Sequence, residues 1–394
     1  MSLPLSDLIH RTDASPVVAA QALTKGRVFP ADKPLLNVSQ AAPVAPPPQG
    51  LRAEIARAAL EDDDTHLYGA VLGDASLRSA LAQTTSSLYH AQIAPEEVAI
   101  TSGANQAFTA VMTTLAAPGD EVILPTPWYF NHKMWCDMAG VRAVPLPTGD
   151  DLLPDLESAA RLIGPRTRAI VLISPNNPGG VEYPSDLLSH FFALARDRGI
   201  ALILDETYRD FRADDAPPHV LFRQPDWRGT FIHLYSFSKV YRLTGHRVGA
   251  IIADRGRLAE VEKVLDTVTI CPSRLGQRAA SYGLLHLNDW VASERAEIIA
   301  RGVAMRDGFH VLAAKGWRLA GLGGFFAYVE HPFDIPSDEV VARLVNEAHI
   351  LALPGTAFRP KGDPRGAREL RLAFANLDRD HFPELFARLA EFEA

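Results

Sequence analysis

One stretch of the sequence, residues 168–206, decides the fold class and reads RAIVLISPNNPGGVEYPSDLLSHFFALARDRGIALILDE. It begins and ends with short apolar runs, RAIVLIS (168–174) and IALILDE (200–206). Between them, SDLLSHFFALARDRG (185–199) repeats apolar residues with the period of a helix and ends at a glycine. Near-continuous apolar strands that alternate with a helix predict a parallel sheet covered by helices on both faces.

The same alternation extends through most of the chain. Further strands are expected in 97–101, 121–125, 142–146, 230–236 and 247–254, and a further helix in 105–117. We therefore predict an α/β fold with a mostly parallel sheet of about seven strands. After about residue 290 the pattern changes to that of a smaller α+β unit. The expected division is an N-terminal arm (1–45) that joins the small domain, a large domain (46–285) and a small C-terminal domain (286–394).

Composition excludes several classes of protein. The 394 residues are 47% hydrophobic and 22% charged, with a net charge of −8, which is ordinary for a globular protein and argues against a nucleic-acid binder. The two cysteines form no CxxC or Cys/His cluster, so neither a disulfide framework nor a metal site is expected. No apolar run is long enough to span a membrane and no signal peptide is recognisable, so we expect a cytoplasmic protein. The proline-rich AAPVAPPPQG (41–50) suggests that residues 1–50 are extended rather than packed.

Ligands of open α/β sheets bind beyond the carboxyl ends of the strands. After the run 97–101 comes Ser102-Gly103-Ala104-Asn105-Gln106 at the start of a helix, where backbone N–H groups can bind an anion such as phosphate. After 168–174 comes PNNPGG (175–180), a rigid turn that can hold an asparagine amide toward a ligand. Taken alone, residues 102–106 fit an ordinary strand-to-helix turn equally well, and residues 175–180 fit a simple tight turn better than a ligand site.

The two following strand ends carry charge. Asp205 ends an apolar run, where a buried acid needs a partner, whereas Glu206 is expected to face outward or to pair locally. Lys239 follows the run 230–236 in SFSK, with Arg247 downstream and Ser236 before it. A buried amine is poorly placed as an ammonium but suited to form an imine. An anion cradle, a fixed amide, an acid and such a lysine together match the needs of pyridoxal phosphate.

With these motifs the sequence resembles the class I/II aminotransferases, which are fold-type I pyridoxal-phosphate enzymes. The resemblance extends along nearly the whole chain. It rests on YGxxxGxxxLR (68–78), SGANQA (102–107), NNPGG (176–180), DETY (205–208), SFSK with Arg247, and LRLAF (370–374).

The resemblance implies roles for individual residues. Lys239 would form the imine with the cofactor and then move the substrate proton, and Asp205 would keep the pyridine nitrogen protonated. Asn177 and Tyr208 would donate hydrogen bonds to the ring oxygen. Tyr129, preferred over its neighbour Trp128, would stack on the ring.

Further residues would bind the phosphate and the substrate. The phosphate would be held by Gly103, Ala104, Asn105, Ser236 and Arg247, and by Tyr68 of the neighbouring subunit in a homodimer with shared sites. Arg371 would bind the substrate carboxylate, although a salt bridge to an acid is the alternative. Ala41 stands where the family usually has a glycine next to the substrate. His132 would support Asp205, unless it is a surface histidine.

The implied reaction is transfer of an amino group from an L-amino acid to a 2-oxo acid by a ping-pong mechanism. An elimination such as that of carbon–sulfur lyases, or a cyclase or oxidase reaction, would use the same cofactor and stays open. A cofactor-binding transcription regulator is disfavoured because too few residues precede the first motif, and a plain nucleotide-binding protein because GxxxxGK[ST] and GxGxxG are missing. The resemblance does not extend to a particular amino donor or acceptor.

Overall fold

A seven-stranded sheet forms the centre of the computed structural model, which describes residues 3–42 and 44–393. Residues 1, 2 and 43 of the expected arm and residue 394 of the expected small domain lie outside these described residues. The sheet has the order β2-β8-β7-β6-β5-β3-β4, and only β8 runs antiparallel to its neighbours. Its strands are β2 (Val98–Thr101), β3 (Glu121–Thr126), β4 (Arg142–Pro147), β5 (Thr167–Ile173), β6 (Ala201–Asp205), β7 (Phe231–Ser236) and β8 (Gly249–Ile252). The predicted α/β fold is confirmed.

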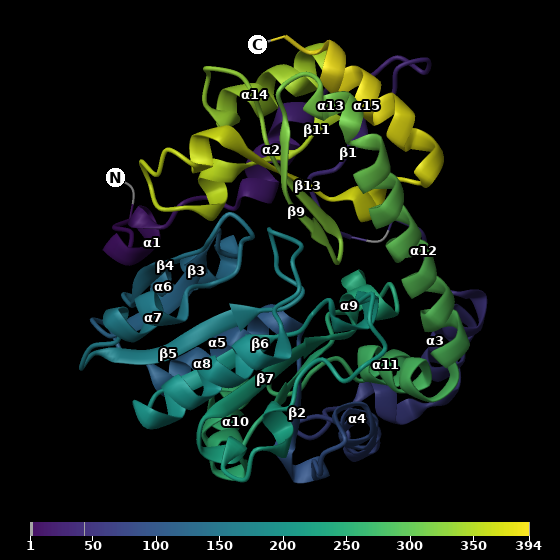
Figure 1. Cartoon of the computed structure of the whole chain (residues 1–394). Helices are drawn as coiled ribbons and strands as arrows, with labels where there is room; N and C mark the ends of the chain where they lie inside the picture. The colour runs from purple at the N-terminus through teal and green to yellow at the C-terminus, as the bar shows by residue number, and fades with distance from the viewer. Residues whose placement is uncertain (1–2, 43, 394) are drawn as a thin grey trace.

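Helices cover both faces of this sheet, as its apolar strands require (Figure 1). One face packs against α3 (Gln49–Glu61), α4 (Ala75–Tyr89), α7 (Leu156–Leu162), α8 (Ser185–Asp197) and α11 (Arg274–His286). The other packs against α5 (Ala104–Leu115), α6 (Phe130–Ala139) and α10 (Arg255–Thr269). In α8 the buried residues Leu188, Phe191, Phe192 and Ala195 recur with helical spacing.

A smaller domain contains a four-stranded antiparallel sheet of order β12-β13-β10-β9. Its strands are β9 (Arg318–Gly323), β10 (Phe326–Glu330), β12 (Leu353–Pro354) and β13 (Glu369–Leu372). A separate apolar core joins this sheet to α12 (Asn288–Gly308), α13 (His310–Ala313), α14 (Ser337–Arg343) and α15 (Phe382–Glu391). The long helix α12 runs along one side of the molecule from the larger to the smaller domain (Figure 1).

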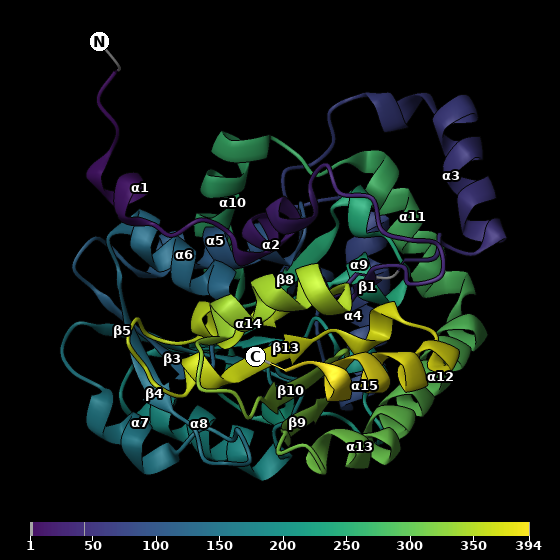
Figure 2. The same ribbon diagram turned by 90° about the horizontal axis from the view of Figure 1, so that it is seen from above.

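The N-terminal arm is not simply extended, and that expectation was wrong. It forms α1 (Asp7–Arg11) and α2 (Pro16–Thr24), which begins with a proline at its first position, where a missing N–H costs nothing. The proline-rich segment that prompted the expectation begins only after these helices. Farther along, β1 (Leu36–Asn37) pairs in parallel with β11 (Ile350–Leu351) in a separate two-stranded sheet. Figure 2 shows the arm running from α1, beside α6, through α2 to β1.

Among residues 3–42 and 44–393, none of the helices combines the length and the apolar character that crossing a bilayer requires.

Candidate active site

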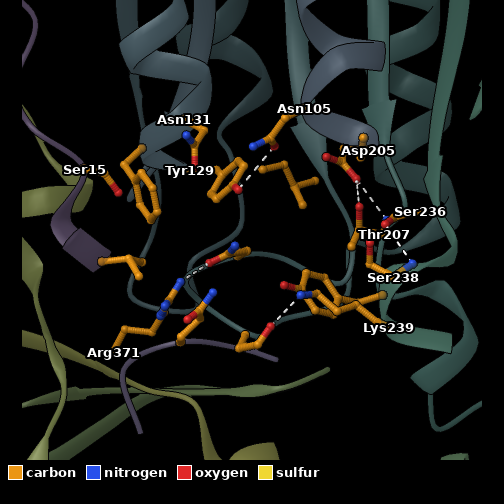
Figure 3. A pocket seen from close by; sticks show the side chains of 18 of the residues that line it. Ser15, Asn105, Tyr129, Asn131, Asp205, Thr207, Ser236, Ser238, Lys239 and Arg371 are labelled. Carbon is orange, nitrogen blue, oxygen red and sulfur yellow. Dashed lines mark hydrogen bonds between the residues drawn. The ribbon is translucent and has the colours of Figure 1, made fainter. Parts of the chain in front are cut away.

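A cavity of about 350 Å³ opens at the carboxyl ends of β5, β6 and β7, between the sheet and the smaller domain (Figure 3). The structure brings most of the predicted site residues together around it. Those that line it are Ala41, Ala104, Asn105, Tyr129, Asn177, Asp205, Tyr208, Ser236, Lys239, Arg247 and Arg371. They come from widely separated parts of the chain, from the arm to β13 (Glu369–Leu372), so the folded topology is what assembles them.

Lys239 lies in the short helix α9 (Phe237–Val240), which follows directly on β7. Its Nζ donates a hydrogen bond of 2.5 Å to the carbonyl oxygen of Ala41 in the arm. Burial, reinforced by the positive charges of Arg247 and Arg371, lowers the pKa of Lys239 to about 8. Because its ordinary pKa is about 10.4, a much larger fraction of this amine is neutral, and so nucleophilic, near neutral pH.

Asp205 ends β6 with its carboxylate directed into the cavity. Its Oδ1 accepts hydrogen bonds from the backbone N–H and the hydroxyl of Thr207, at 2.9 and 2.7 Å. Among the described residues, no lysine or arginine forms an ion pair with it. Burial raises the pKa of Asp205 to about 6. A buried acid without a cation favours a positively charged group in the cavity.

His132 stands behind Asp205, with its Nε2 3.8 Å from Oδ2. It is buried and stacks on Phe108 with a centroid distance of 3.8 Å, so it is not a surface histidine. Burial lowers the pKa of His132 to about 3, which makes it neutral at pH 7. It can therefore orient the carboxylate but does not supply a countercharge.

Tyr129 and Tyr208 supply the aromatic surface of the cavity. The hydroxyl of Tyr129 lies 3.4 Å from the amide oxygen of Asn105, while the neighbouring Trp128 packs into the core on the outer side of this turn. The side chain of Tyr208 is buried against Phe325 and Phe326. Of the two candidates for the stacking position, only Tyr129 faces the cavity.

The predicted anion cradle forms where α5 begins. Gly103 has a φ of 89°, and a Cβ at this position would collide with the guanidinium of Arg247, so a glycine is required here. Arg247 Nη1 lies 3.4 Å from the hydroxyl of Ser238. Backbone N–H groups of a helix N-terminus, a guanidinium and the hydroxyls of Ser236 and Ser238 thus converge on one end of the cavity.

Arg371 is part of β13 and lies at the end of the cavity opposite this cradle (Figure 3). Its side chain is almost fully buried. Its Nη1 donates a 2.8 Å hydrogen bond to Asn177 Oδ1, and its Nη2 donates to the carbonyl oxygen of Ser39. Its Nε has no partner, and no acid of the described chain pairs with it, so the alternative of a salt bridge does not apply. Burial lowers the pKa of Arg371 to about 10. The guanidinium remains a cation with free hydrogen-bonding capacity.

The chain is similar to known proteins over most of its length. The family model described as aminotransferase class I and II matches residues 33–389. The chain belongs to this family. It is 28% identical over 331 residues to an aromatic aminotransferase of Arabidopsis thaliana, covering 82% of this chain and 80% of the relative. It is 25% identical over 370 residues to an aspartate aminotransferase of Sulfolobus acidocaldarius, covering 91% and 90%.

Solved structures share the fold of this aminotransferase. Aspartate aminotransferase from Thermus thermophilus with maleate superposes with a TM-score of 0.87 at 24% identity, covering 99% of both chains. The protein YbdL from Escherichia coli, described with a methionine aminotransferase function, gives a TM-score of 0.88 at 22% identity, covering 99% of this chain and 100% of that one. At these identities the likeness establishes the fold alone.

Some residues of the aminotransferase depart from the predicted arrangement. Tyr68 lies outside the cavity with 78% of its surface exposed, so it does not meet the other predicted residues within one chain. Glu206 neither faces outward nor pairs locally: it is buried and bonded to His233 and Tyr89, because alternation along β6 turns it into the core opposite Asp205.

Several cavity residues of the aminotransferase were not predicted. Thr207 lies in the DETY motif, two residues after Asp205, and Ser238 lies in the SFSK motif, next to Lys239. Hydroxyl residues so close to a predicted site acid and lysine were the sequence feature that could have indicated them. Ser15, Val17, Val18, Gln40 and Asn131 also line the cavity, four of them from the arm. The arm residues carried no local signal, because only the folded chain brings the arm over the sheet.

Proposed function

We propose that this aminotransferase holds pyridoxal 5′-phosphate on Lys239 and transfers an amino group from an L-amino acid to a 2-oxo acid by a ping-pong mechanism. One observation carries the proposal: the buried amine of Lys239 and the buried, cation-free carboxylate of Asp205 face the same cavity. The amine of Lys239 would bind the carbonyl group of the cofactor, and the carboxylate of Asp205 would pair with its protonated ring nitrogen.

The donor set fits this cofactor from end to end. The cradle at Gly103, Ala104, Asn105, Ser236 and Arg247 suits a phosphate. Asn177 and Tyr208 lie on the cavity wall to donate to the ring oxygen, and Tyr129 offers a face for the ring. When bound, pyridoxal phosphate supplies an electron-withdrawing ring that stabilises negative charge at the substrate α-carbon.

The protein residues then bind, orient and move a proton. Arg371 offers two N–H groups as a fork for the α-carboxylate, now occupied by Asn177 and Ser39. The carbonyl of Ala41 holds Lys239 Nζ. Once a substrate amine had displaced it from the cofactor, this amine would accept and return the α-proton as a neutral base. A pKa lowered to about 8 by burial favours that neutral form.

The substrate side chain is proposed to be uncharged. Ser15, Val17, Val18, Gln40 and Asn131 line the cavity beyond the residues assigned above, and none is ionisable. Three other arginines of the chain lie elsewhere: Arg27 bonds to Asn346, Arg274 pairs with Asp64 and Asp74, and Arg11 lines a different cavity. We expect donors with apolar or amide side chains to react faster than aspartate.

The site is proposed to be completed in a homodimer. Leu67 and Tyr68 are 63% and 78% exposed, which is unusual for adjacent large apolar residues and leaves them available to a second copy of the chain. Tyr68 of the partner subunit would then reach the phosphate. The division into an arm (1–45), a large domain (46–285) and a small domain (286–394) is retained as part of this proposal.

The lysine assignment is tested by reducing the protein with borohydride after loading with pyridoxal phosphate. Peptide mapping is expected to place the pyridoxyl label on Lys239, and the variant Lys239→Ala should carry none. The exposed Lys263, paired with Glu260, and Lys133, paired with Asp137, serve as internal controls. A label on either of them, with Lys239 unmodified, would overturn the mechanism.

The reaction is tested by supplying amino donors without an acceptor and then adding 2-oxo acids. Transamination predicts one equivalent of 2-oxo acid per site, followed by turnover only when an acceptor is present. Continuous release of pyruvate and ammonia from a β-substituted amino acid, with no half-reaction from any donor, would instead establish an elimination enzyme.

A further inference from the structure

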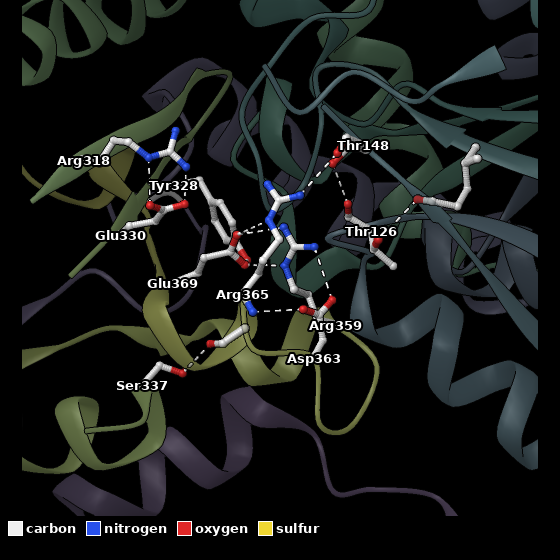
Figure 4. A network of polar contacts seen from close by, with 12 residues as sticks. Thr126, Thr148, Arg318, Tyr328, Glu330, Ser337, Arg359, Asp363, Arg365 and Glu369 are labelled. Atoms are coloured by element: carbon white, nitrogen blue, oxygen red, sulfur yellow. Dashed lines mark hydrogen bonds and ion pairs between the residues drawn. The ribbon is translucent and has the colours of Figure 1, made fainter. Parts of the chain in front are cut away.

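A buried ion pair lies directly behind Arg371 and has no part in the proposed chemistry. Glu369 has no exposed surface, and the side chain of Arg359 is only 2% exposed. Two nitrogens of Arg359 engage both carboxylate oxygens, with Nη2 2.8 Å from Oε1, and the hydroxyl of Tyr328 donates at 2.8 Å to Oε2 (Figure 4). The carboxylate of Glu369 is thereby saturated with donors.

This pair is linked to Arg371 by geometry on two sides. Glu369 and Arg371 are two residues apart on β13, so their side chains leave the same face of the strand. The guanidinium of Arg371 lies close to two aromatic rings, 4.8 Å from the centroid of Phe326 and 5.2 Å from that of Phe358. Phe358 immediately precedes Arg359 in the chain.

The second ring belongs to the same network. Phe326 lies two residues before Tyr328 on β10, and Tyr328 stands opposite Arg371 in the strand register. The ring of Tyr328 meets that of Phe358 edge to face at 6.3 Å. Both rings near Arg371 therefore belong to segments that also carry a residue bonded to Glu369, namely Tyr328 and Arg359.

The network also reaches the larger domain. The carbonyl oxygen of Phe358 accepts a 2.8 Å hydrogen bond from the N–H of Trp128, the residue before Tyr129. Arg365, whose Nε lies 3.9 Å from Glu369, donates from Nη1 to the carbonyl oxygen of Thr148 at 3.3 Å. The loop that carries Arg359 thus contacts the aromatic turn of the cavity as well as the strand of Arg371.

A fully buried ion pair is a weak source of stability, since removing two charges from water offsets most of their attraction. Its fixed fork geometry is better suited to hold a loop in one position. We propose that Arg359 and Glu369 are positioning residues, which fix Phe358 against Arg371 and so orient its guanidinium for the substrate carboxylate. This inference rests on the proposed function in that Arg371 is taken to bind the carboxylate.

The test compares variants of the cofactor-loaded protein. Arg359→Lys keeps the charge but loses the fork, and Arg359→Met/Glu369→Leu removes both charges so that neither is left alone. The matched control is Arg318→Met/Glu330→Leu. That pair also joins an arginine to a glutamate, with Nε 2.8 Å from Oε2, but it lies at the exposed end of the same sheet with side chains 45% and 27% exposed.

The measurement is calorimetric binding of the 2-oxo acid that the wild type accepts best, added to the pyridoxal form, with which it cannot react. We expect the affinity to fall about tenfold in both Arg359 variants, the size of a coupling of roughly 1.4 kcal/mol between neighbouring groups. The control variant should bind as the wild type does. In an Arg371→Ala background the Arg359 changes should cause no further loss, and the cofactor absorption band should be unchanged throughout.

Each failure points to a different assumption. If Arg371→Ala binds the 2-oxo acid as tightly as the wild type does, the carboxylate assignment in the proposed function is wrong. If Arg371→Ala weakens binding but both Arg359 variants bind normally, the positioning role is overturned. It is also overturned if the Arg359 changes weaken binding as much in the Arg371→Ala background as in the wild type. Should the charge-free double variant not fold, Arg359→Lys alone decides between these results, and its melting temperature shows that it is folded.

Discussion

Two acids stand side by side at the end of β6, and both are nearly inaccessible to solvent, with Asp205 5% and Glu206 1% exposed. Because side chains alternate along a strand, they enter opposite layers of the larger domain. Asp205 faces the cavity, keeps only the hydrogen bonds from Thr207 on one oxygen, and has a pKa raised to about 6 by burial.

Glu206 enters the opposite layer and is surrounded by donors. Tyr89 and His233 bond to its Oε2, the latter at 2.8 Å, and His219 lies 3.5 Å away. Burial alone would raise the pKa of Glu206, but the two histidines hold it well below its ordinary value. One oxygen of its carboxylate is therefore held by donors that the fold itself supplies.

We infer that this difference separates the acid proposed to act on the cofactor from a structural one. Burial is the same for both, so burial does not tell them apart. What differs is whether the fold supplies the partners that a buried carboxylate needs. Glu206 has them already, whereas Asp205 leaves one oxygen directed into a cavity that can accept a cationic ligand.

The largest effect is expected when the functional acid is neutralised. Asp205→Asn keeps the size of the side chain but removes the charge that would hold a proton on the cofactor ring, and it should lower kcat about 10³-fold, in line with other electrostatic contributions to catalysis. Steady-state rates and the cofactor absorption spectrum measure this loss. Glu206→Gln is the matched control, and an equal loss of kcat in both variants would remove the distinction between the two acids.

Neutralising Glu206 should lower stability while leaving kcat nearly unchanged. In Glu206→Gln an amide NH₂ faces groups that all donate, so the free energy of unfolding should fall by about 3 kcal/mol, the cost of leaving buried polar groups unsatisfied. The kcat of the folded fraction should stay within a few-fold of wild type. Urea unfolding monitored by circular dichroism gives the first quantity. A variant as stable as the wild type would show that the donors around Glu206 contribute little.

The sequence was sufficient to predict Asp205 but not Glu206. Buried apolar strands and the polar residues that follow them are local features, so the sheet and Lys239 could be placed from the order of residues, whereas Arg371 was placed by the resemblance to the family. The surroundings of Glu206 are not local. Tyr89 lies 117 residues before it, and His233 lies 27 residues after it. No pattern near DETY indicates that these side chains converge.

The same reasoning explains the other omissions. The pair of Arg359 and Glu369 looks like two surface charges in the sequence, and only the packing of the loop onto β13 buries it. The arm residue Gln40 reaches the cavity because β1 pairs with β11, more than 300 residues away. Local periodicity predicts elements, whereas contacts distant in sequence decide which charges become buried.

The smallest effect concerns stability without the cofactor, and its sign follows from the direction of the pKa shift. With a pKa of about 6 in the folded protein and 3.8 as its ordinary value, Asp205 binds more protons folded than unfolded between these pH values. Its contribution to stability is therefore fully present below about pH 4 and is lost as the pH rises through 6. Asp205→Asn has no such group, so above pH 6 the cofactor-free variant should be more stable than the wild type by at most about 3 kcal/mol.

Chemical denaturation of both cofactor-free proteins at about pH 4.5, early in the predicted loss, and at about pH 7.5, beyond its end, measures this difference. Loading with pyridoxal phosphate should reverse its sign, because the wild-type carboxylate then gains the cationic partner that the fold withholds, while the asparagine does not. Glu206→Gln should be destabilised with and without the cofactor. If Asp205→Asn were likewise less stable in both forms, Asp205 would be a second structural acid, and the cavity would have lost the unpartnered charge on which its proposed chemistry depends.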